Sequence, residues 1–477
     1  MPPTTLAQVE ATQVLAPYMS VFFLAFLVSL VATPLMRSLA LANGIVDVPD
    51  LLRKNHREPI AYLGGVAIFI GWLIGILGCN FVVPHTFDVP DGGITVEFPI
   101  SIVIGGIAIV MTGMLDDIYG ISPRLKIGGQ LFAAAGLALD DIGHRFVENS
   151  LGLLGLGFVP EVVVYCLGTV LLAFLVVAGC NAVNLIDGLD GLAAGVCAIA
   201  TLGFLAVATL VAVNGLGNAD IAVASLATDP IRIVMCLAVV GAILGFLPYN
   251  FNPATIFMGD AGSLLLGFFG VTSILLFADT GGAALKLGIA CLIIFGVPIT
   301  DTSLAIIRRK MRGKPIFSPD NEHLHHLLRR SGYTVRQSVG ILYAVAVGFA
   351  VIGVGMVAMD LELRYVLAVF AVIYAFIFVT MYKVARNLAA RDRAIAPPPA
   401  ADPATLADAV APDAEPTADG PLVAATNGHA NGNGNGHAAP PAARETGSPG
   451  REPPPPTPPR PRPPTAGPPH GPPRPRG

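Results

Sequence analysis

Eleven apolar stretches, each close in length to a membrane-spanning helix, follow one another between residues 18 and 383. A helix needs roughly 20 apolar residues to cross about 30 Å of hydrocarbon. Hydrophobic residues make up 54% of the chain and charged residues only 13%, which is too little polar surface to cover a water-soluble globule. The sequence therefore predicts an all-α polytopic membrane protein. The stretches run over residues 18–40, 61–83, 99–115, 126–141, 161–179, 192–213, 231–249, 262–279, 284–304, 338–359 and 364–383.

The loops between these stretches differ in their content of basic residues. Cytoplasmic loops carry an excess of Lys and Arg, and here one set of alternate loops holds most of them. We therefore expect a multi-pass protein of the plasma membrane with its N-terminus outside and its C-terminus in the cytoplasm. The loops assigned to the cytoplasm carry Arg37, Arg53, Lys54, Arg57, Arg124, Lys126 and the basic residues from Arg308 to Arg336, and the opposite loops carry Arg145, Arg232, Lys286 and Arg364.

The composition changes near residue 395, where Pro, Ala, Gly and Asn begin to dominate. Such a segment cannot bury enough apolar surface to offset the entropy of ordering it. We expect a membrane domain over residues 1–394 and a disordered cytoplasmic tail over residues 395–477. No nucleic-acid partner is expected, and a homodimer is left open.

Acidic residues gather at the ends of the apolar stretches on the predicted cytoplasmic side. They are Asp116, Asp117, Asp187, Asp190 and Asp260. Carboxylates held together repel one another, so a divalent cation is expected to neutralise them, and oxygen ligands favour Mg²⁺ or Mn²⁺ over zinc. This convergence depends on the helix count, because removing the short stretch 126–141 would divide the acids between the two faces.

The run from Asn181 to Gly191 has a regular polar spacing. Asn181, Asn184 and Asp187 are three residues apart, which places them on one face if the preceding helix continues through them. Gly188 and Gly191 would then end the helix and let a ligand approach the backbone. We interpret this run as part of a binding site, with a plain polar loop as the alternative.

Asp260 stands at the start of a predicted helix, within Phe257-Met-Gly-Asp-Ala-Gly-Ser263. Backbone N–H groups at a helix start favour phosphate oxygens, and Asp260 would hold a metal that bridges them. The alternative is that Asp260 only caps its helix.

Three histidines and a basic segment complete the polar clusters. The side chains of His323, His325 and His326 suit either a transition metal or the binding of a pyrophosphate or sugar. The segment that begins at Lys54 suits either an anionic substrate or simple anchoring of the topology.

Five segments of the chain resemble motifs of the polyprenyl-phosphate N-acetylhexosamine-1-phosphate transferase family and occur in the same order as in that family. The resemblance covers about residues 18 to 385. The segment after Lys54 is more similar to the branch that uses UDP-N-acetylglucosamine than to the branch that transfers phospho-muramoyl-pentapeptide. The Ala- and Pro-rich composition and the tail resemble those of actinobacterial members, whose carrier would be decaprenyl phosphate. The segments are Lys54-Asn-His-Arg-Glu-Pro-Ile-Ala-Tyr-Leu-Gly-Gly65, Leu115-Asp-Asp-Ile-Tyr-Gly-Ile-Ser-Pro-Arg-Leu-Lys126, Asn181 to Gly191, Phe257 to Ser263 and His323 to His326.

The resemblance implies transfer of N-acetylglucosamine-1-phosphate from UDP-N-acetylglucosamine to an undecaprenyl or decaprenyl phosphate, with release of UMP and with Mg²⁺ or Mn²⁺ as cofactor. It implies that Asp260 and Asp117 bind the metal and that Asp116 is a base or positions the acceptor phosphate. It further implies a substrate-binding set formed by Lys54, Asn181, Asn184, Asp187, Asp190, His323, His325 and His326.

Three alternatives remain open from the sequence. The same chemistry would serve a muramoyl-pentapeptide donor, and an aspartyl-phosphate intermediate would divide the transfer into two steps. An ion-coupled transporter would also carry intramembrane acids, although it would place them near the middle of its spans.

Overall fold

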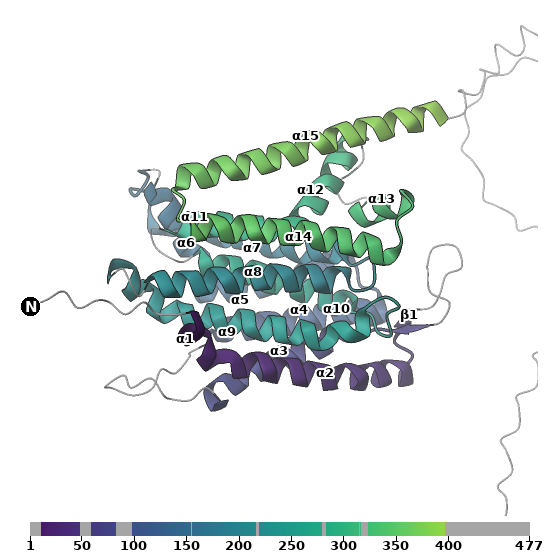
Figure 1. Cartoon of the computed structure of the whole chain (residues 1–477), viewed down its shortest axis with the longest axis horizontal. Helices are drawn as coiled ribbons and strands as arrows, with labels where there is room; N and C mark the ends of the chain where they lie inside the picture. Colours follow the sequence, from purple (N-terminus) through teal and green to yellow (C-terminus); the bar gives the residue numbers. More distant parts are fainter. Residues whose placement is uncertain are drawn as a thin grey trace, which may run out of the picture. The chain divides into compact units, whose positions relative to one another are not determined.

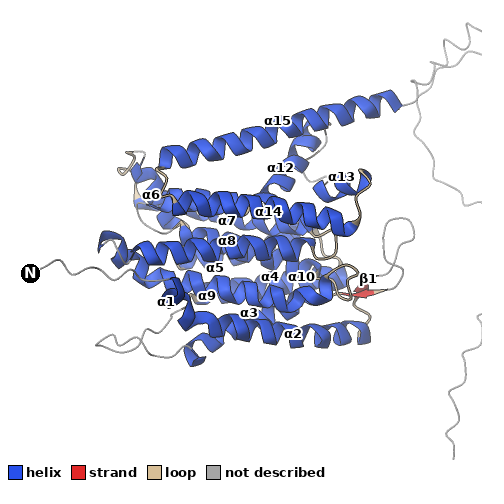
Figure 2. Ribbon diagram, viewed as in Figure 1, coloured by secondary structure: helices blue, strands red, loops and turns tan. Residues whose placement is uncertain are grey.

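The computed structural model describes residues 11–47, 59–82, 98–153, 155–215, 219–278, 283–313, 315 and 323–395. Within these ranges the protein is a bundle of α-helices with one small two-stranded sheet (Figure 2). The tail predicted over residues 395–477 lies outside these ranges, except for Ile395 at the end of the last helix. The elements are α1 Ala11–Leu15, the short 3-10 helix η1 Ala16–Tyr18, α2 Met19–Ala42, β1 Val46–Asp47, β2 Ile60–Ala61, α3 Gly64–Val82, α4 Ile100–Tyr119, α5 Pro123–Leu139, α6 His144–Leu153, α7 Glu161–Ile186, α8 Leu192–Gly215, α9 Ala219–Asn250, α10 Gly259–Phe277, α11 Ala284–Ile294, α12 Gly296–Met311, α13 Leu324–Arg330, α14 Val335–Ala358 and α15 Leu363–Ile395.

The helices confirm an all-α polytopic membrane protein in its broad form. In the described part of the chain, eight helices are long and apolar enough to cross a membrane. The pair α11 and α12, bent by 75°, raises this to as many as nine. Each predicted stretch falls on a helix or on this bent pair, but the apolar part of α3 and the 17 residues of α5 are shorter than a full span. The count of eleven crossings and the orientation stay predictions.

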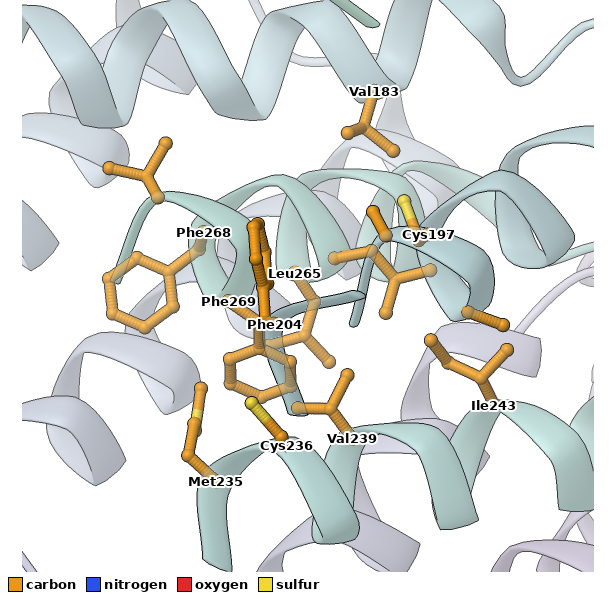
Figure 3. Packing of buried hydrophobic residues seen from close by; sticks show 14 of the residues in the cluster. Val183, Cys197, Phe204, Met235, Cys236, Val239, Ile243, Leu265, Phe268 and Phe269 are labelled. Carbon is orange, nitrogen blue, oxygen red and sulfur yellow. The ribbon is translucent and has the colours of Figure 1, made fainter. Parts of the chain in front are cut away.

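Helix α10 lies at the centre of the bundle. Every residue from Ala261 to Phe277 is buried, and the helix contacts α3, α4, α7 and α8. Figure 3 shows Phe268 and Phe269 of α10 close to Phe204 of α8 and Met235 of α9. In a membrane protein a helix that is apolar on all sides can face either lipid or other helices, and the burial of α10 shows that other helices surround it. Around this core, α2, α9, α8 and α14 lie side by side (Figure 1).

Glycines let two helices approach the start of α10 very closely. A Cβ atom at Gly65 of α3 would overlap the backbone of Gly262, and one at Gly113 of α4 would overlap that of Ala261. Close backbone approach through small residues is a common way for helices to pack in membranes. These two contacts hold the ends of α3 and α4 against the residue pair that follows Asp260.

A short strand arrangement fixes the loop before α10. Strands β1 and β2 pair antiparallel, with Asp47 opposite Ile60, and Ala61 forms a parallel bridge with Ile256. Phe257 N donates to Ala61 O over 2.8 Å, and Gly64 N donates to Phe257 O over 3.0 Å. The loop that leads into Asp260 is therefore tied to the loop that leads into α3.

Candidate active site

One cavity of about 740 Å³ opens at the end of the bundle where α4 and α7 end and α10 begins. Pockets for small molecules and cofactors typically have volumes of about 300–1,000 Å³. Several acids, two arginines and a histidine are among the residues that line this cavity. The lining residues are Asp47, Tyr62, Asp117, Asn184, Asp187, Gly188, Leu189, Asp190, Asn250, Asn252, Phe257, Gly259, Asp260, His326, Arg329, Arg330 and Val335.

Asp117 caps the start of α10 from the last turn of α4. Its carboxylate accepts hydrogen bonds from Asp260 N at 2.7 Å and from Ala261 N at 3.1 Å. A carboxylate at a helix N-terminus is stabilised by the unpaired N–H groups and the helix dipole. We expected from the sequence that the first N–H groups of this helix bind phosphate oxygens. That expectation is wrong for the N–H groups of Asp260 and Ala261, because both already donate to Asp117. The alternative that Asp260 caps its own helix also fails, since no side chain of the N-cap residue Met258 or of Asp260 makes that bond.

Lys126, in the second turn of α5, is the cation at the centre of the acidic cluster. Its ammonium group lies 3.2 Å from Asp116, forms an ion pair with Asp260 and donates to Asn184 over 3.4 Å. The cluster is only partly exposed, so these ion pairs are less screened than surface pairs would be. Lys126 thus neutralises acids that come from two other helices.

Asn184 joins the end of α7 to the start of α10. Its amide group donates to Asp260 Oδ1 over 2.7 Å and to Ser263 Oγ over 2.9 Å. Because α7 continues to Ile186, the predicted helix does carry both Asn181 and Asn184. Asn181, however, donates to Gln130 Oε1 over 2.9 Å, in the contact between α7 and α5, and is absent from the cavity wall.

Asp187 differs from the other acids in having no hydrogen-bond donor among the described residues. It is partly buried directly after α7. Burial raises the pKa of Asp187 to about 8, and the carboxylates of Asp260, Asp117 and Asp190 add to that shift. The proton or a cation that neutralises Asp187 must therefore come from outside this set of side chains.

Asp190 has mainly a structural part in the cavity wall. Its carboxylate accepts hydrogen bonds from Asn252 Nδ2 at 2.9 Å and from Ala254 N at 3.1 Å. Gly191, which follows it at a φ of +76°, donates its N–H to Asn250 Oδ1 over 3.0 Å. The helix therefore ends after Ile186, as predicted. The hydrogen bonds of Asp190 and Gly191 hold the loop after α7 against the loop before α10.

The residues from His323 to Arg330, here called the histidine segment, contain the part of the cavity wall that belongs to α13. His326, Arg329 and Arg330 line the wall, whereas His323 and His325 lie buried behind it. His325 packs against Gly188, where an added Cβ would meet its Nε2 atom. Burial lowers the pKa of His325 to about 4, with a further contribution from His326. The His325 ring is therefore neutral at pH 7.

The structure brings together most of the residues that the motifs predicted, but with unequal roles. Asp116, Asp117, Asn184, Asp187, Asp190, Asp260 and His326 belong to the cavity or to its first hydrogen-bonded partners. Lys54 lies outside the described residues. The sequence reasoning missed Lys126, whose signal was a lone lysine near the start of an otherwise apolar stretch. It also missed Asn250, Arg329 and Arg330, which carried no spacing signal.

The donor set suits a hard divalent cation. In the described part of the chain no three or more His, Cys, Asp or Glu side chains already form a compact metal cluster. Even so, Asp117, Asp187 and Asp260 line one cavity and offer only oxygen atoms, and among the described residues Asp187 has no hydrogen-bond donor. Oxygen ligands of this kind match Mg²⁺ or Mn²⁺. The residues present therefore fit such an ion.

The family comparison agrees with the site. The profile described as Glycosyl transferase family 4 matches residues 99–278, which include Asp116, Asn184 and Asp260.

Several bacterial proteins are similar over most of the membrane domain. A probable undecaprenyl-phosphate N-acetylglucosaminyl 1-phosphate transferase of Bacillus subtilis is 34% identical over 336 residues, which are 69% of this chain and 82% of that protein. An undecaprenyl-phosphate alpha-N-acetylglucosaminyl 1-phosphate transferase of Yersinia pestis is 32% identical, over 69% of this chain and 81% of its own. A decaprenyl-phosphate N-acetylglucosaminephosphotransferase of Mycobacterium tuberculosis is 32% identical, over 67% and 77% of the two chains.

Proposed function

We propose a function for this protein on the ground that the chain belongs to glycosyl transferase family 4, among the polyprenyl-phosphate N-acetylglucosamine-1-phosphate transferases. It transfers N-acetylglucosamine-1-phosphate from UDP-N-acetylglucosamine to a polyprenyl phosphate and releases UMP. The observation that carries this proposal is a cavity at one end of a membrane bundle that Asp117, Asp187 and Asp260 line, with Lys126 paired to Asp260 and to Asp116. Relatives that act on undecaprenyl and on decaprenyl phosphate are similar to the chain to nearly the same degree, so either carrier fits.

The reaction is a displacement at phosphorus. An oxygen of the polyprenyl phosphate attacks the β-phosphorus of the donor, the bond from that phosphorus to the bridging oxygen breaks, and UMP leaves with the electron pair. A phosphate monoester has a second pKa of about 6, so the acceptor is largely dianionic at pH 7 and needs no strong base. The main obstacle is repulsion between two anionic groups, which positioned positive charge relieves.

Lys126 supplies one such charge. It is held by Asp116 and Asp260, so its position does not depend on substrate, and a preorganised cation has little reorganisation left to undergo in the transition state. Asp116 thereby positions Lys126 from within the same cluster, which supports a positioning role for this acid rather than that of a base.

The metal is assigned to the acids that face the cavity. Asp117 and Asp260 would hold the divalent ion, and Asp187 adjoins them as a third oxygen donor. Such an ion, when bound, neutralises the charge of the diphosphate and polarises its phosphorus–oxygen bonds. Asn184 keeps the Asp260 carboxylate in one orientation through its 2.7 Å hydrogen bond.

The basic residues of the lining suit the sugar and the diphosphate. His326, Arg329 and Arg330 add hydrogen-bond donors and positive charge to the cavity that the acids also line. Arginine binds phosphate groups with two parallel hydrogen bonds, which fixes their orientation. Because the basic loops predict this end of the bundle to be cytoplasmic, a soluble nucleotide sugar would enter from the cytoplasm and the lipid from the membrane.

The proposal is tested with purified protein in lipid nanodiscs. The protein is incubated with labelled UDP-N-acetylglucosamine and decaprenyl phosphate, and the expected result is a labelled lipid together with UMP in equal amounts. Addition of EDTA should stop the reaction, and Mg²⁺ or Mn²⁺ should restore it. Asp260→Asn serves as the inactive control.

Three results would contradict parts of the proposal. Labelled lipid formed only from UDP-muramoyl-pentapeptide would change the donor, and turnover unaffected by EDTA would remove the metal. A phosphorylated protein trapped with donor alone would replace direct transfer by a two-step route. Absence of any lipid product with either donor would overturn the function itself.

A further inference from the structure

A buried carboxylate behind the cavity carries a role that the motifs do not assign. Asp301 lies in α12, five residues after the bend that separates α12 from α11, and it is fully buried. A carboxylate removed from water is costly unless it is hydrogen-bonded or paired. Asp301 therefore needs partners, and both of them belong to the histidine segment.

The two oxygens of Asp301 bind two adjacent residues. Oδ2 lies 2.8 Å from Nδ1 of His323, and Oδ1 accepts the backbone N–H of Leu324 over 2.8 Å. Leu324 is the first residue of α13, and no side chain of its own N-cap residue satisfies that N–H. Asp301 thus caps α13 from a different helix and at the same time orients the ring before it.

The contact also fixes the tautomer of His323. An ionised carboxylate only accepts hydrogen bonds, so Nδ1 must carry the proton, and Nε2 holds the lone pair of a neutral ring. The three imidazoles then form one packed group. The His323 and His325 rings are stacked with centroids 5.9 Å apart, and those of His325 and His326 are 4.2 Å apart.

His326 is the member of that group that lines the cavity, and Arg329 and Arg330 follow it on the same short helix. We infer that Asp301 is a positioning residue: it anchors His323 and the start of α13, and so holds His326 and the two arginines against the acidic wall. Asp301 touches neither the cavity nor any reacting atom, so it acts on the reaction only through this segment. As far as catalysis is concerned, the inference rests on the proposed transferase function.

Two substitutions separate the two contacts. Asp301→Asn keeps an oxygen that can accept the Leu324 N–H, but its NH₂ group faces Nδ1 of His323 and favours the other tautomer. Asp301→Ala removes both contacts, and Asp301→Glu keeps the charge with a longer side chain. Ser303→Ala, two residues further along α12 at a partly exposed position, is the matched control.

We expect kcat to fall in the variants that lose the contact between Asp301 and His323 and to stay unchanged in the control. Partners that orient a functional histidine typically contribute about 10- to 100-fold to activity, so Asp301→Asn should lower kcat by about that factor. The KM for UDP-N-acetylglucosamine should change less, Asp301→Glu should recover part of the loss, and Ser303→Ala should match the unaltered protein. The double variant Asp301→Asn with His323→Ala should be no slower than His323→Ala alone, because both substitutions remove the same interaction and leave the acceptor of the Leu324 N–H in place.

Hydrogen exchange tests the anchoring without any activity. Amides of residues 324–330 should exchange faster in Asp301→Ala, while those of α10 keep their protection. Unchanged exchange in α13 would overturn the inference, and so would multiplied losses in the double variant or an Asp301→Asn protein with normal kcat. If the unaltered protein transfers no sugar phosphate, the proposed function fails, whereas the exchange result still decides the role of Asp301.

Discussion

The two ends of α10 hold charge in opposite ways. At its start, the carboxylate of Asp117 accepts two backbone N–H groups, and further acids surround it with Lys126. At its end, Arg232 of α9 donates to Leu276 O from Nε over 3.0 Å and from an NH₂ group over 2.8 Å, and it lies 5.4 Å from the Phe277 ring centroid. An anion at the start of a helix and a cation at its end both suit the helix dipole.

The two ends of α10 differ in whether charged side chains are present beyond those that cap the helix. The far end is closed, because Arg232 is 1% exposed and its guanidinium is used on the last turn of α10. At the near end Asp116 and Asp260 pair with Lys126, and acids also line a cavity. Capping therefore accounts for the charge at the far end, whereas the near end combines capping with a cavity of a size that suits a ligand.

The largest effect should come from Asp260. Asp260→Asn removes the negative charge that pairs with Lys126 and one of the two oxygens to which Lys126 and Asn184 donate, and it weakens a proposed metal ligand. Loss of one preorganised electrostatic group commonly costs 10²- to 10³-fold in kcat, and we expect roughly a 10³-fold loss here. The measurement is turnover of labelled UDP-N-acetylglucosamine in nanodiscs.

The control for that measurement is Asp140→Asn, which alters an exposed acid at the far end of α5 and should leave kcat unchanged. An Asp260→Asn protein of normal activity would show that the near end, like the far end, serves stability alone.

Replacement of Lys126 should have the next largest effect. Lys126→Met leaves Asp116 and Asp260 without their cation, and we expect kcat to fall by about 10²-fold. Lys126→Arg should retain part of the activity, since it keeps the charge with a different geometry. Equal activities for the Met and Arg variants would mean that the charge of Lys126 contributes nothing, and steady-state kinetics with both variants will decide this.

Arg232 should show the opposite pattern. Arg232→Met removes the donors to Leu276 O, and a buried carbonyl without a partner costs about 1–3 kcal/mol. We expect a lower unfolding temperature in detergent with little change in kcat of the folded fraction. A loss of kcat at unchanged stability would break the comparison between the two ends of α10.

The smallest effect concerns the pH dependence of Asp187. Its pKa is raised from 3.8 to about 8, so between these values the folded chain keeps a proton that the unfolded chain has released. Stability without metal should therefore fall as pH rises through this range, and Asp187→Asn should abolish this part of the pH dependence. Thermal unfolding in EDTA from pH 5 to pH 9 measures it.

The same raised pKa predicts competition between protons and the metal. A cation must displace the proton of Asp187, so more Mg²⁺ is needed at low pH. As pH rises toward 8, the Mg²⁺ concentration for half-maximal activity should decrease by up to about tenfold per pH unit. A pH-independent requirement for Mg²⁺ would remove Asp187 from the metal site.

Much of the site was predictable because polar residues are rare in this chain. Asp116, Asp117 and Asp260 stand at the ends of apolar stretches, where an unpaired charge is expensive, so their positions alone indicated function. Partner choice was not predictable. Asn181 and Asn184 share a helix face in the sequence, yet the first binds Gln130 and the second binds Asp260.

Asp301 illustrates the same limit. In the sequence it is one acid in an apolar stretch, 22 residues before His323, and nothing in its spacing links the two. The link exists because α12, which follows a 75° bend after α11, packs beside His323 in the tertiary structure.

The sequence by itself determined that the chain is a helical membrane protein and that acids, amides and histidines gather at the ends of its apolar stretches. Apolar length and the cost of charge near hydrocarbon act locally along the chain, so they can be read from it. Only the tertiary structure decided that Asp117 caps α10 and that Lys126 pairs with acids of two other helices. Those outcomes depend on which helices pack together, because a hydrogen bond extends only about 3 Å while the partners are up to 144 residues apart.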